Sequence, residues 1–411
     1  MKRAIFVLVF VAFLDAAGLG LVFPLFASML FDPDCALLRP ETSDTVRGIW
    51  LGALISAAPT TQMLVSSSLG SLSDRIGRKP LILSCLLFGT VAYLFAAYAV
   101  HTENLLGLLF SRICIGIPFA TFGLTNAAIS DISTDEGKGR GFAWINSAYG
   151  SGLAIGPLLG GVLAGNLLFA EESFVRPFII SSMLLAIAVL FVIYWLPETR
   201  KLSEEEAIEE DSLLKELKRA DTKLIFLLLG TFLFTFGWVF YIEMIPVWWM
   251  SRYDLDPCEV GILFGFGSLW FVLTSTFVAG PLLKRINPLV LFEAFALFLC
   301  LSIWIVFVID APIAYLFEIA VQNMAAGLLF PVTAMAVSNM ASADHQGKIM
   351  GIYAAAEGLG FGLSPISSGL FIGIHLMAPI AIGGLFVLIA FILAHVVRRR
   401  ESLALIREKV E

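Results

Sequence analysis

Long apolar runs separated by short polar segments make up most of the chain. A helix needs about 20 mainly apolar residues to cross the hydrocarbon core of a bilayer. Twelve runs meet this requirement: 4–30, 48–70, 80–100, 104–130, 140–166, 174–196, 222–250, 258–282, 288–309, 312–340, 347–372 and 375–397. Because the runs are continuous rather than alternating, a β-barrel is excluded. The pattern predicts an all-α membrane protein with twelve transmembrane helices and no large soluble domain.

Basic residues are distributed unevenly between the two sets of loops. With the N-terminus in the cytoplasm, the outer side holds only Arg39, Arg47, Arg176 and Arg252, and most other Lys and Arg residues fall on the cytoplasmic side. Cytoplasmic loops carry the excess of Lys and Arg, so both termini are predicted to be cytoplasmic. The first run follows Lys2 and Arg3 and has no small-residue cleavage site, which indicates a span rather than a signal peptide. The short loops suit a bacterial inner membrane.

Composition excludes several classes of protein. Of the 411 residues, 59% are hydrophobic and 14% are charged, whereas about a quarter are charged in an ordinary soluble domain. The formal charge of −7 disfavours nucleic acid as a partner, since that would require a basic face. The five cysteines and four histidines have no metal-ligand spacing, and no GxxxxGK[ST] loop for a nucleotide is present. We therefore expect no metal and no cofactor.

An internal repeat divides the chain. Shifting the sequence by 208 residues places 150–161 on 358–369 and matches Gly150, Gly152, Pro157 and Gly161 in type. A polar, charge-rich segment, 197–221, lies between the two copies. The predicted organisation is an N-terminal six-helix half (1–196), a cytoplasmic linker (197–221), a C-terminal six-helix half (222–397) and a cytoplasmic tail (398–411). Two such halves are typical of alternating-access transporters, which bind substrate between them.

The loop after the second run has a distinctive pattern. It reads Gly-Ser-Leu-Ser-Asp-Arg-Ile-Gly-Arg-Lys over 70–79. Glycines allow tight turns, and an aspartate can stabilise a helix N-terminus. The pattern resembles the GxLxDRxGRK signature of the major facilitator superfamily, in which this loop latches the two halves. The resemblance implies a conformational latch that includes Gly70, Asp74, Arg75, Gly77, Arg78 and Asp131.

Within this latch, the resemblance suggests Asp131, at the end of the fourth run, as a partner for Arg75. The corresponding loop of the second half, 280–285, lacks the aspartate. A latch there would be weaker.

A second motif lies in the fifth run. Gly152, Gly156, Pro157, Gly160 and Gly161 form the pattern GxxxGPxxGG. GxxxG spacing places small residues on one helix face and permits close packing of a neighbouring backbone. The motif resembles the one found in twelve-span drug:proton antiporters, where it is associated with export. The first run, over 14–24, is similar to that of tetracycline-type exporters in the same group.

Six ionisable residues fall inside the predicted spans, and such residues are costly there and commonly functional. Asp15 and Arg112 lie well inside the first and fourth runs, and the stretch around Arg112 and Gly116 resembles an RxxxG motif of the family. We expect Asp15 and Arg112 to interact directly or through water and, with Glu357, to couple transport to protons. A static buried Asp15–Arg112 pair is the alternative. Glu293 is expected at the interface.

Polar residues at cavity depth are candidates for substrate contact. Asn and Gln in spans can equally serve as links between helices, and the two acidic candidates, near the outer ends of their runs, could instead sit at a wet interface. The candidate substrate-binding residues are Gln62, Asn126, Asn146, Gln322, Asn323, Glu318 and Glu243.

These features together predict a non-enzymatic, proton-coupled secondary transporter that exports a small, partly apolar compound by alternating access. Its expected partners are the substrate, protons and the lipid bilayer, and a monomer is expected. A dedicated metabolite or siderophore exporter, or an uptake symporter for a small organic solute, remains an alternative. No catalytic constellation lies at membrane depth, which argues against a membrane-embedded enzyme.

Overall fold

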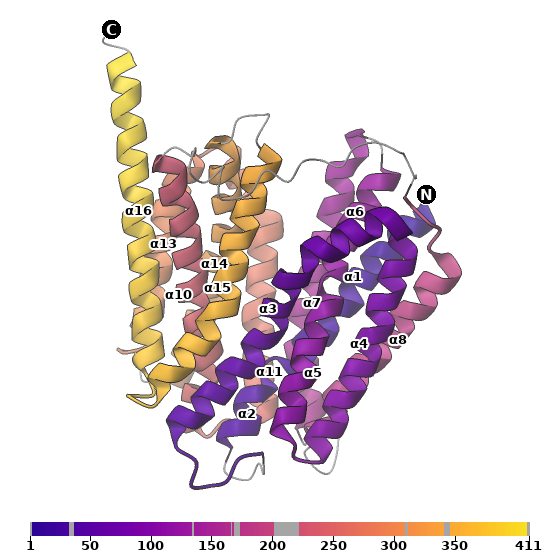
Figure 1. Ribbon diagram of the computed structural model, residues 1–411. Coiled ribbons are helices and arrows are strands. Elements are labelled where there is room, and N and C mark those ends of the chain that lie inside the picture. Colours follow the sequence, from indigo (N-terminus) through magenta and orange to yellow (C-terminus); the bar gives the residue numbers. More distant parts are fainter. Residues whose placement is uncertain are drawn as a thin grey trace. The chain divides into compact units, whose positions relative to one another are not determined.

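A computed structural model describes residues 2–32, 37–133, 135–165, 167, 173–200, 222–308, 311–340 and 346–408. Helices are the only regular elements in these ranges (Figure 1). They are α1 (Lys2–Val22), α2 (Leu25–Phe31), α3 (Asp44–Ile76), α4 (Arg78–His101), α5 (Leu105–Phe119), α6 (Thr121–Ile132), α7 (Asp135–Ala164), α8 (Val175–Trp195), α10 (Thr222–Tyr253), α11 (Pro257–Leu273), the π-helix η1 (Thr274–Val278), α12 (Ala279–Leu283), α13 (Pro288–Ile305), α14 (Pro312–Met340), α15 (Gln346–Ile372) and α16 (Ala378–Glu408).

These helices supply 12 candidate membrane spans within the described residues, which confirms the predicted fold class. Three spans are composite. Span 1 joins α1 and α2 across Phe23 and Pro24, and span 4 joins α5 and α6 just after Pro118. Proline interrupts a helix because it lacks an N–H and clashes with the preceding turn. Span 8 contains α11, η1 and α12.

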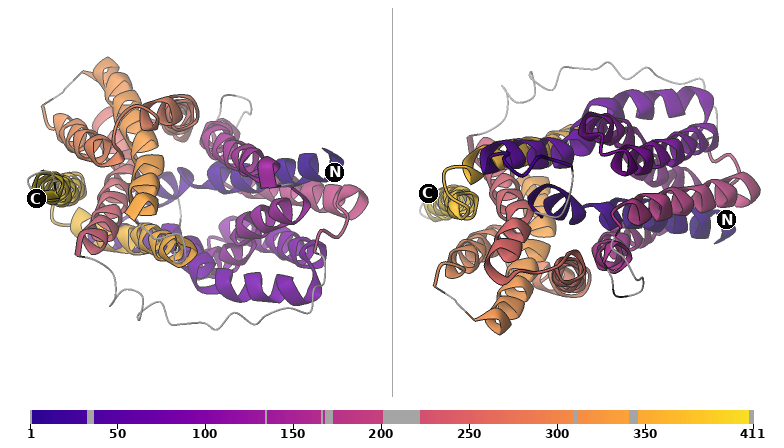
Figure 2. Two further views of the ribbon diagram at one scale, coloured as in Figure 1. Left: turned by 90° about the horizontal axis from the view of Figure 1, so that it is seen from above. Right: turned by 90° about the horizontal axis from the view of Figure 1, so that it is seen from below.

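Two compact units make up the chain. Unit 1 contains Met1–Glu205, Pro246–Leu269 and Gly369–Ile374, and unit 2 contains Glu206–Ile245, Trp270–Ser368 and His375–Glu411. In unit 1 the main packed pairs are α1 with α7, α4 with α8, and α3 with α5. In unit 2, α13 packs against α14 and α16. Figure 2 shows α16, in yellow, almost end-on.

Large apolar side chains are exposed along many helices, as a protein surface in contact with lipid requires. On α4, for example, Val91 is 64% exposed and Tyr98 62%, and on α8 Tyr194 is 72% exposed. A soluble protein rarely exposes so much contiguous apolar surface. The side chains that the sequence singles out for function are instead mostly buried.

Candidate functional site

The loop between α3 and α4 is held by a buried arginine. The Arg78 guanidinium lies 2.7 Å from Oδ1 of Asp74 and donates from Nε to Oδ2 of Asp131 at 3.0 Å. It also donates to the Ser73 hydroxyl. Arg75 is exposed and pairs with neither aspartate. The predicted Arg75–Asp131 pair is therefore wrong: Arg78, three residues further along and the first residue of α4, takes that place.

Glu198, which the sequence reasoning did not single out, completes this network. Its Oε1 accepts from the backbone N–H of Arg78 at 2.9 Å, and its Oε2 accepts from that of Lys79 at 3.1 Å. These are the first two N–H groups of α4, which have no partner within the helix. The Pro-Glu-Thr-Arg stretch at 197–200, just beyond span 6, was the available signal. Glu198 thus ties the end of span 6 to the start of α4.

Gly77 fits this arrangement for two reasons. Its φ of +99° is a conformation that residues with a side chain rarely adopt. A Cβ there would also lie 2.5 Å from Oε2 of Glu198. Gly70, by contrast, has no atom within 4 Å of the position a Cβ would take. The glycine at 77 is required by the local geometry, and the one at 70 is not.

We predict that Glu198 contributes to the pH dependence of the protein's stability. Partial burial raises the pKa of its carboxyl, but hydrogen bonds from the N–H groups of Arg200, Arg78, Lys79 and Thr199 outweigh this and lower it overall from the ordinary 4.5. A lowered pKa in the folded state gives stability that is present above pH 4.5 and is lost as the pH falls through the folded pKa. We expect Glu198→Gln to unfold at lower temperature at pH 7 and to lose less stability than wild type below pH 4.5.

Thermal unfolding of the detergent-solubilised protein from pH 7 to well below pH 4.5 would measure this. Glu103→Gln, a change at an exposed acid between α4 and α5, is the control and should follow the wild-type curve. Parallel pH curves for wild type and Glu198→Gln would contradict the prediction.

The glycines of α7 form a close seam with α1. A Cβ on Gly156 would lie 2.6 Å from Cα of Gly20 and 2.8 Å from the Ala17 carbonyl oxygen, and one on Gly160 would overlap the Leu21 carbonyl. Gly161 faces another neighbour within unit 1, since a Cβ there would lie 2.8 Å from Cα of Gly261. Spacing by four residues places Gly152, Gly156 and Gly160 on one helix face. The motif therefore serves close backbone approach.

The second-half copy of this motif packs in a similar way inside unit 2. A Cβ on Gly360 of α15 would lie 2.9 Å from Cβ of Thr235 in α10, and the Ser364 hydroxyl donates to the Phe236 carbonyl at 2.7 Å. Gly360 and Ser364 are the repeat counterparts of Gly152 and Gly156. Corresponding helices of the two sequence repeats thus make corresponding contacts.

Asp15 and Arg112 are both buried in unit 1 but form no direct ion pair. Arg112 is 1% exposed; its Nε donates to the Leu54 carbonyl at 3.1 Å, and its guanidinium carbon lies 4.9 Å from the centre of the Phe26 ring. Its Nη1 has no hydrogen-bond partner among the described residues. Asp15 is 3% exposed and has no cation in ion-pair range among those residues. The expectation of direct contact is not met, and contact through water stays a prediction.

Two glutamates of unit 2 accept hydrogen bonds from tyrosine hydroxyls. The Tyr241 hydroxyl lies 2.9 and 3.0 Å from the two carboxyl oxygens of Glu318. The Tyr353 hydroxyl donates to Oε1 of Glu357, four residues along α15. The sequence did not identify either tyrosine as a partner. Nothing in the chain order brings Tyr241 to Glu318, whereas the spacing of four residues between Tyr353 and Glu357 was an available signal. No ion pair to Glu318 or Glu357 is formed by the described residues.

Glu243 and Glu293, the remaining acids in the spans, have contrasting surroundings. Glu243 is 4% exposed, and its Oε2 has no partner among the described residues. Glu318 is likewise only 3% exposed, so neither side chain lies at the surface of the protein. Glu293 of α13 instead joins α16 through His395, at 2.7 Å, and through Arg398. Glu293 therefore has a structural ion-pair role.

Amide side chains at cavity depth mostly bond to backbone. Gln62 donates to the Phe119 carbonyl at 3.0 Å, which links α3 to α5. Gln322 is fully buried and accepts from the Trp238 indole at 3.0 Å, while its Nε2 has no described partner. The other three amides, Asn126, Asn146 and Asn323, donate to the carbonyl four residues earlier in their own helices. Gln322 is thus the one of these five amides whose NH2 group makes no hydrogen bond to a described residue.

Aromatic rings surround Trp238 in unit 2. The Trp238 ring lies 5.8 Å from Phe271, nearly parallel to it, and 5.5 Å from Phe330, edge to face. Phe330 is in turn stacked on Phe361 at 6.1 Å. The carboxyl of Glu318 lies one helical turn from Gln322 on α14. Unit 2 therefore combines an aromatic wall with buried carboxyl and amide groups.

Known proteins resemble this chain in sequence and in fold. The Major Facilitator Superfamily profile matches residues 5–324. The class H tetracycline resistance protein of Pasteurella multocida is 27% identical over 292 residues, which cover 69% of this chain and 68% of that protein. Multidrug resistance protein 2 of Bacillus subtilis (strain 168) is 23% identical and covers 98% of this chain and 97% of its own. The crystal structure of a variant of the nucleoside transporter NupG superposes with a TM-score of 0.74 at 16% identity, over 96% of this chain and 99% of that one.

The 12 candidate membrane spans of the described residues, together with the family match, define a multi-pass membrane transporter. The chain belongs to the Major Facilitator Superfamily. It is a non-enzymatic transporter, and its distant relatives include tetracycline resistance and multidrug resistance proteins.

Proposed function

We propose that this protein is a proton-coupled antiporter that exports a small, partly apolar compound by alternating access. The names of two distant relatives, which match 69% and 98% of this chain, support export of drug-like compounds. The intact GxxxGPxxGG motif on α7 supports the antiporter group in particular.

One observation carries the proton-coupling part of the proposal. Asp15 in unit 1 and Glu318 in unit 2 are buried, and Glu357 in unit 2 is half-buried. None of the three has a cationic partner among the described residues, and the two glutamates each accept from a single tyrosine hydroxyl. An ionised carboxylate in such a place is costly unless a cation or hydrogen-bond donors compensate it. A proton or a cationic substrate can each provide that compensation. Competition between the two for the same carboxyl is a direct way to exchange substrate against protons.

The aromatic wall around Trp238 supports a partly apolar substrate. Large flat rings provide apolar contact area with little loss of side-chain entropy. Gln322 and Glu318, close by on α14, offer a free amide donor and an acceptor. Binding sites of this kind are mainly apolar with a few placed polar groups.

The domain organisation and orientation belong to the same proposal. Six-span halves at 1–196 and 222–397, with 197–221 as the linker and 398–411 as the tail, follow from the sequence repeat. The Lys and Arg distribution places both termini in the cytoplasm and suits a bacterial inner membrane. A monomer contains both halves and is sufficient for alternating access.

Transport by purified protein in liposomes with an imposed pH gradient tests the proposal. Wild-type protein is expected to move a drug-like cationic or zwitterionic aromatic compound opposite to protons. Asp15→Asn and Glu357→Gln should each reduce the pH-driven flux to the level of protein-free liposomes, because the neutral amide cannot exchange a proton. Glu103→Gln should transport like wild type, since Glu103 is exposed.

Two outcomes would contradict the proposal. Unchanged pH-driven flux in both Asp15→Asn and Glu357→Gln would remove the proton sites. Substrate and protons moving in the same direction would establish an uptake symporter instead. If all drug-like compounds fail and a metabolite or siderophore is exported against protons, the mechanism holds and the substrate class does not.

A further inference from the structure

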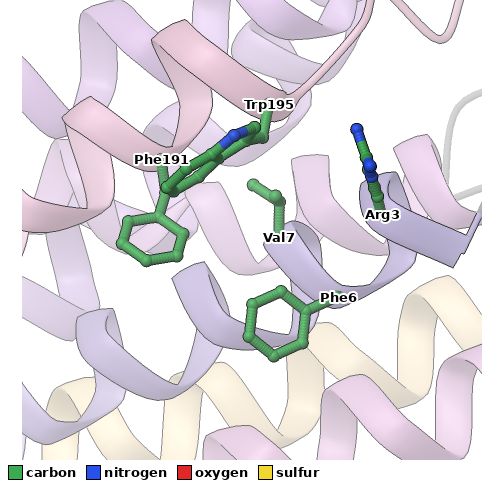
Figure 3. A pocket seen from close by; sticks show the side chains of 5 residues that line it. All are labelled: Arg3, Phe6, Val7, Phe191 and Trp195. Carbon is green, nitrogen blue, oxygen red and sulfur yellow. The ribbon is translucent and has the colours of Figure 1, made fainter.

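An open pocket lies on unit 1 between the first turns of α1 and the last turns of α8. Arg3, Phe6 and Val7 line it from α1, and Phe191 and Trp195 line it from α8 (Figure 3). Its volume is about 380 Å³. None of these five residues belongs to the transport site proposed above, and Phe6 is 59% and Trp195 51% exposed.

One wall of this pocket is a continuous ladder of rings. Phe6 is stacked on Phe10 at 5.9 Å, Phe10 lies 4.7 Å from Phe191, and Phe191 meets Trp195 edge to face at 4.5 Å. The ladder crosses from α1 to α8, so it joins the two helices. Buried Val7 forms the floor between them. A flexible apolar chain can lie along such a surface.

Arg3 adds a positive charge at one end of the pocket. Figure 3 shows its side chain at the side of the pocket away from the Phe191 ring. Arg3 is exposed and has no hydrogen bond or ion pair with another described residue. It lies in the first turn of α1, where the unbonded N–H groups of the helix add further positive potential. The pocket therefore pairs an anion-attracting end with an apolar wall.

We propose that this pocket, to be called the α1–α8 pocket, binds one anionic phospholipid. Arg3 pairs with the phosphate, the Trp195 indole lies at headgroup level, and an acyl chain runs along the rings of Phe6, Phe10 and Phe191. Three features support this occupant: the charge is complementary, the wall is apolar, and tryptophan favours the membrane–water boundary. In the proposed orientation this end faces the cytoplasmic leaflet, where anionic headgroups attract basic residues.

Native mass spectrometry of the purified full-length protein tests the proposal. The protein would be titrated with phosphatidylglycerol or with phosphatidylethanolamine of the same acyl chains. One basic residue near a membrane surface contributes about 1 kcal/mol to the binding of anionic lipid. We expect Arg3→Gln to weaken the first phosphatidylglycerol binding step about five-fold. Phosphatidylethanolamine binding should weaken less, because the ammonium group of that headgroup already offsets the charge of its phosphate.

Two further variants separate the pocket from general charge effects. Arg285→Gln removes an exposed arginine of unit 2 and should bind phosphatidylglycerol like wild type. Trp195→Ala should weaken binding of both lipids, because it shortens the apolar wall. Equal binding of both lipids by wild type, or equal losses in Arg3→Gln and Arg285→Gln, would overturn the proposal. Tight binding of inorganic phosphate that is lost in Arg3→Gln, with no preference between the two lipids, would identify an anion site and also overturn it.

Discussion

Replacing Arg78 by alanine is expected to destabilise the protein strongly, whereas replacing Arg75 by alanine is expected to change little. Arg78 is 7% exposed and contacts Asp74, Asp131 and the Ser73 hydroxyl. Removing one partner of a buried ion pair costs on the order of 3–5 kcal/mol, because the remaining charges lose their compensation. Since the Asp131 side chain is 20% exposed, we expect a value near the lower end, about 3 kcal/mol.

Arg75 is the matched control for Arg78. Both lie in the same loop motif and carry the same charge, but Arg75 is exposed and pairs with neither aspartate. Arg75→Ala should stay within about 0.5 kcal/mol of wild type. Arg78→Lys should be intermediate, because a point charge cannot replace a forked guanidinium that spans two carboxylates. Apparent unfolding temperatures in one detergent at pH 7 would measure all three, and equal losses for Arg75→Ala and Arg78→Ala would refute the assignment.

Replacing Gly156 by leucine is expected to have the second large effect. The added Cβ would lie 2.6 Å from Cα of Gly20 and 2.8 Å from the Ala17 carbonyl oxygen. Both are backbone atoms of α1, so a side-chain rotation cannot relieve the clash. Overpacking of this kind typically costs about 1–3 kcal/mol and sometimes more. Here the whole of α1 must move away from α7.

The matched control is Gly123→Leu on α6. No atom lies within 4 Å of the position where a Cβ on Gly123 would be, and this glycine is exposed. We expect Gly156→Leu to lower the yield of monodisperse protein on size exclusion and to lower its unfolding temperature, and Gly123→Leu to do neither. If both variants behave alike, membrane insertion of leucine rather than helix packing decides the outcome.

Much of the fold follows from local features of the chain. The number of spans and most of their limits could be predicted, because crossing a bilayer sets a minimum apolar length that the sequence displays directly. The break between α1 and α2 follows from the proline at position 24, and the close packing face of α7 follows from the four-residue spacing of its glycines. The polar segment 201–221 lies outside the described residues, so its assignment as a linker stays a prediction.

The partners of the buried charges could not be predicted in the same way. The motif at 70–79 indicated a latch but not which arginine enters it, since Arg75 ends α3, Arg78 begins α4, and the turn at Gly77 sets the direction of each helix end. Glu198 joins that latch from 120 residues away. Tyr241 reaches Glu318 from another helix, 77 residues earlier in the chain. Such contacts depend on helix packing, which no short stretch of sequence specifies.

The sequence by itself determined that this is a twelve-span protein with a repeated half, a glycine motif built for close packing and a few acids inside the membrane. These properties depend on apolar length and on residue spacing along one helix. Only the tertiary structure decided that Arg112 rests on Phe26 and the Leu54 carbonyl instead of pairing directly with Asp15. The reason is physical: the direction of a buried side chain is set by which neighbouring helices leave room for it, and that depends on the packing of the whole unit.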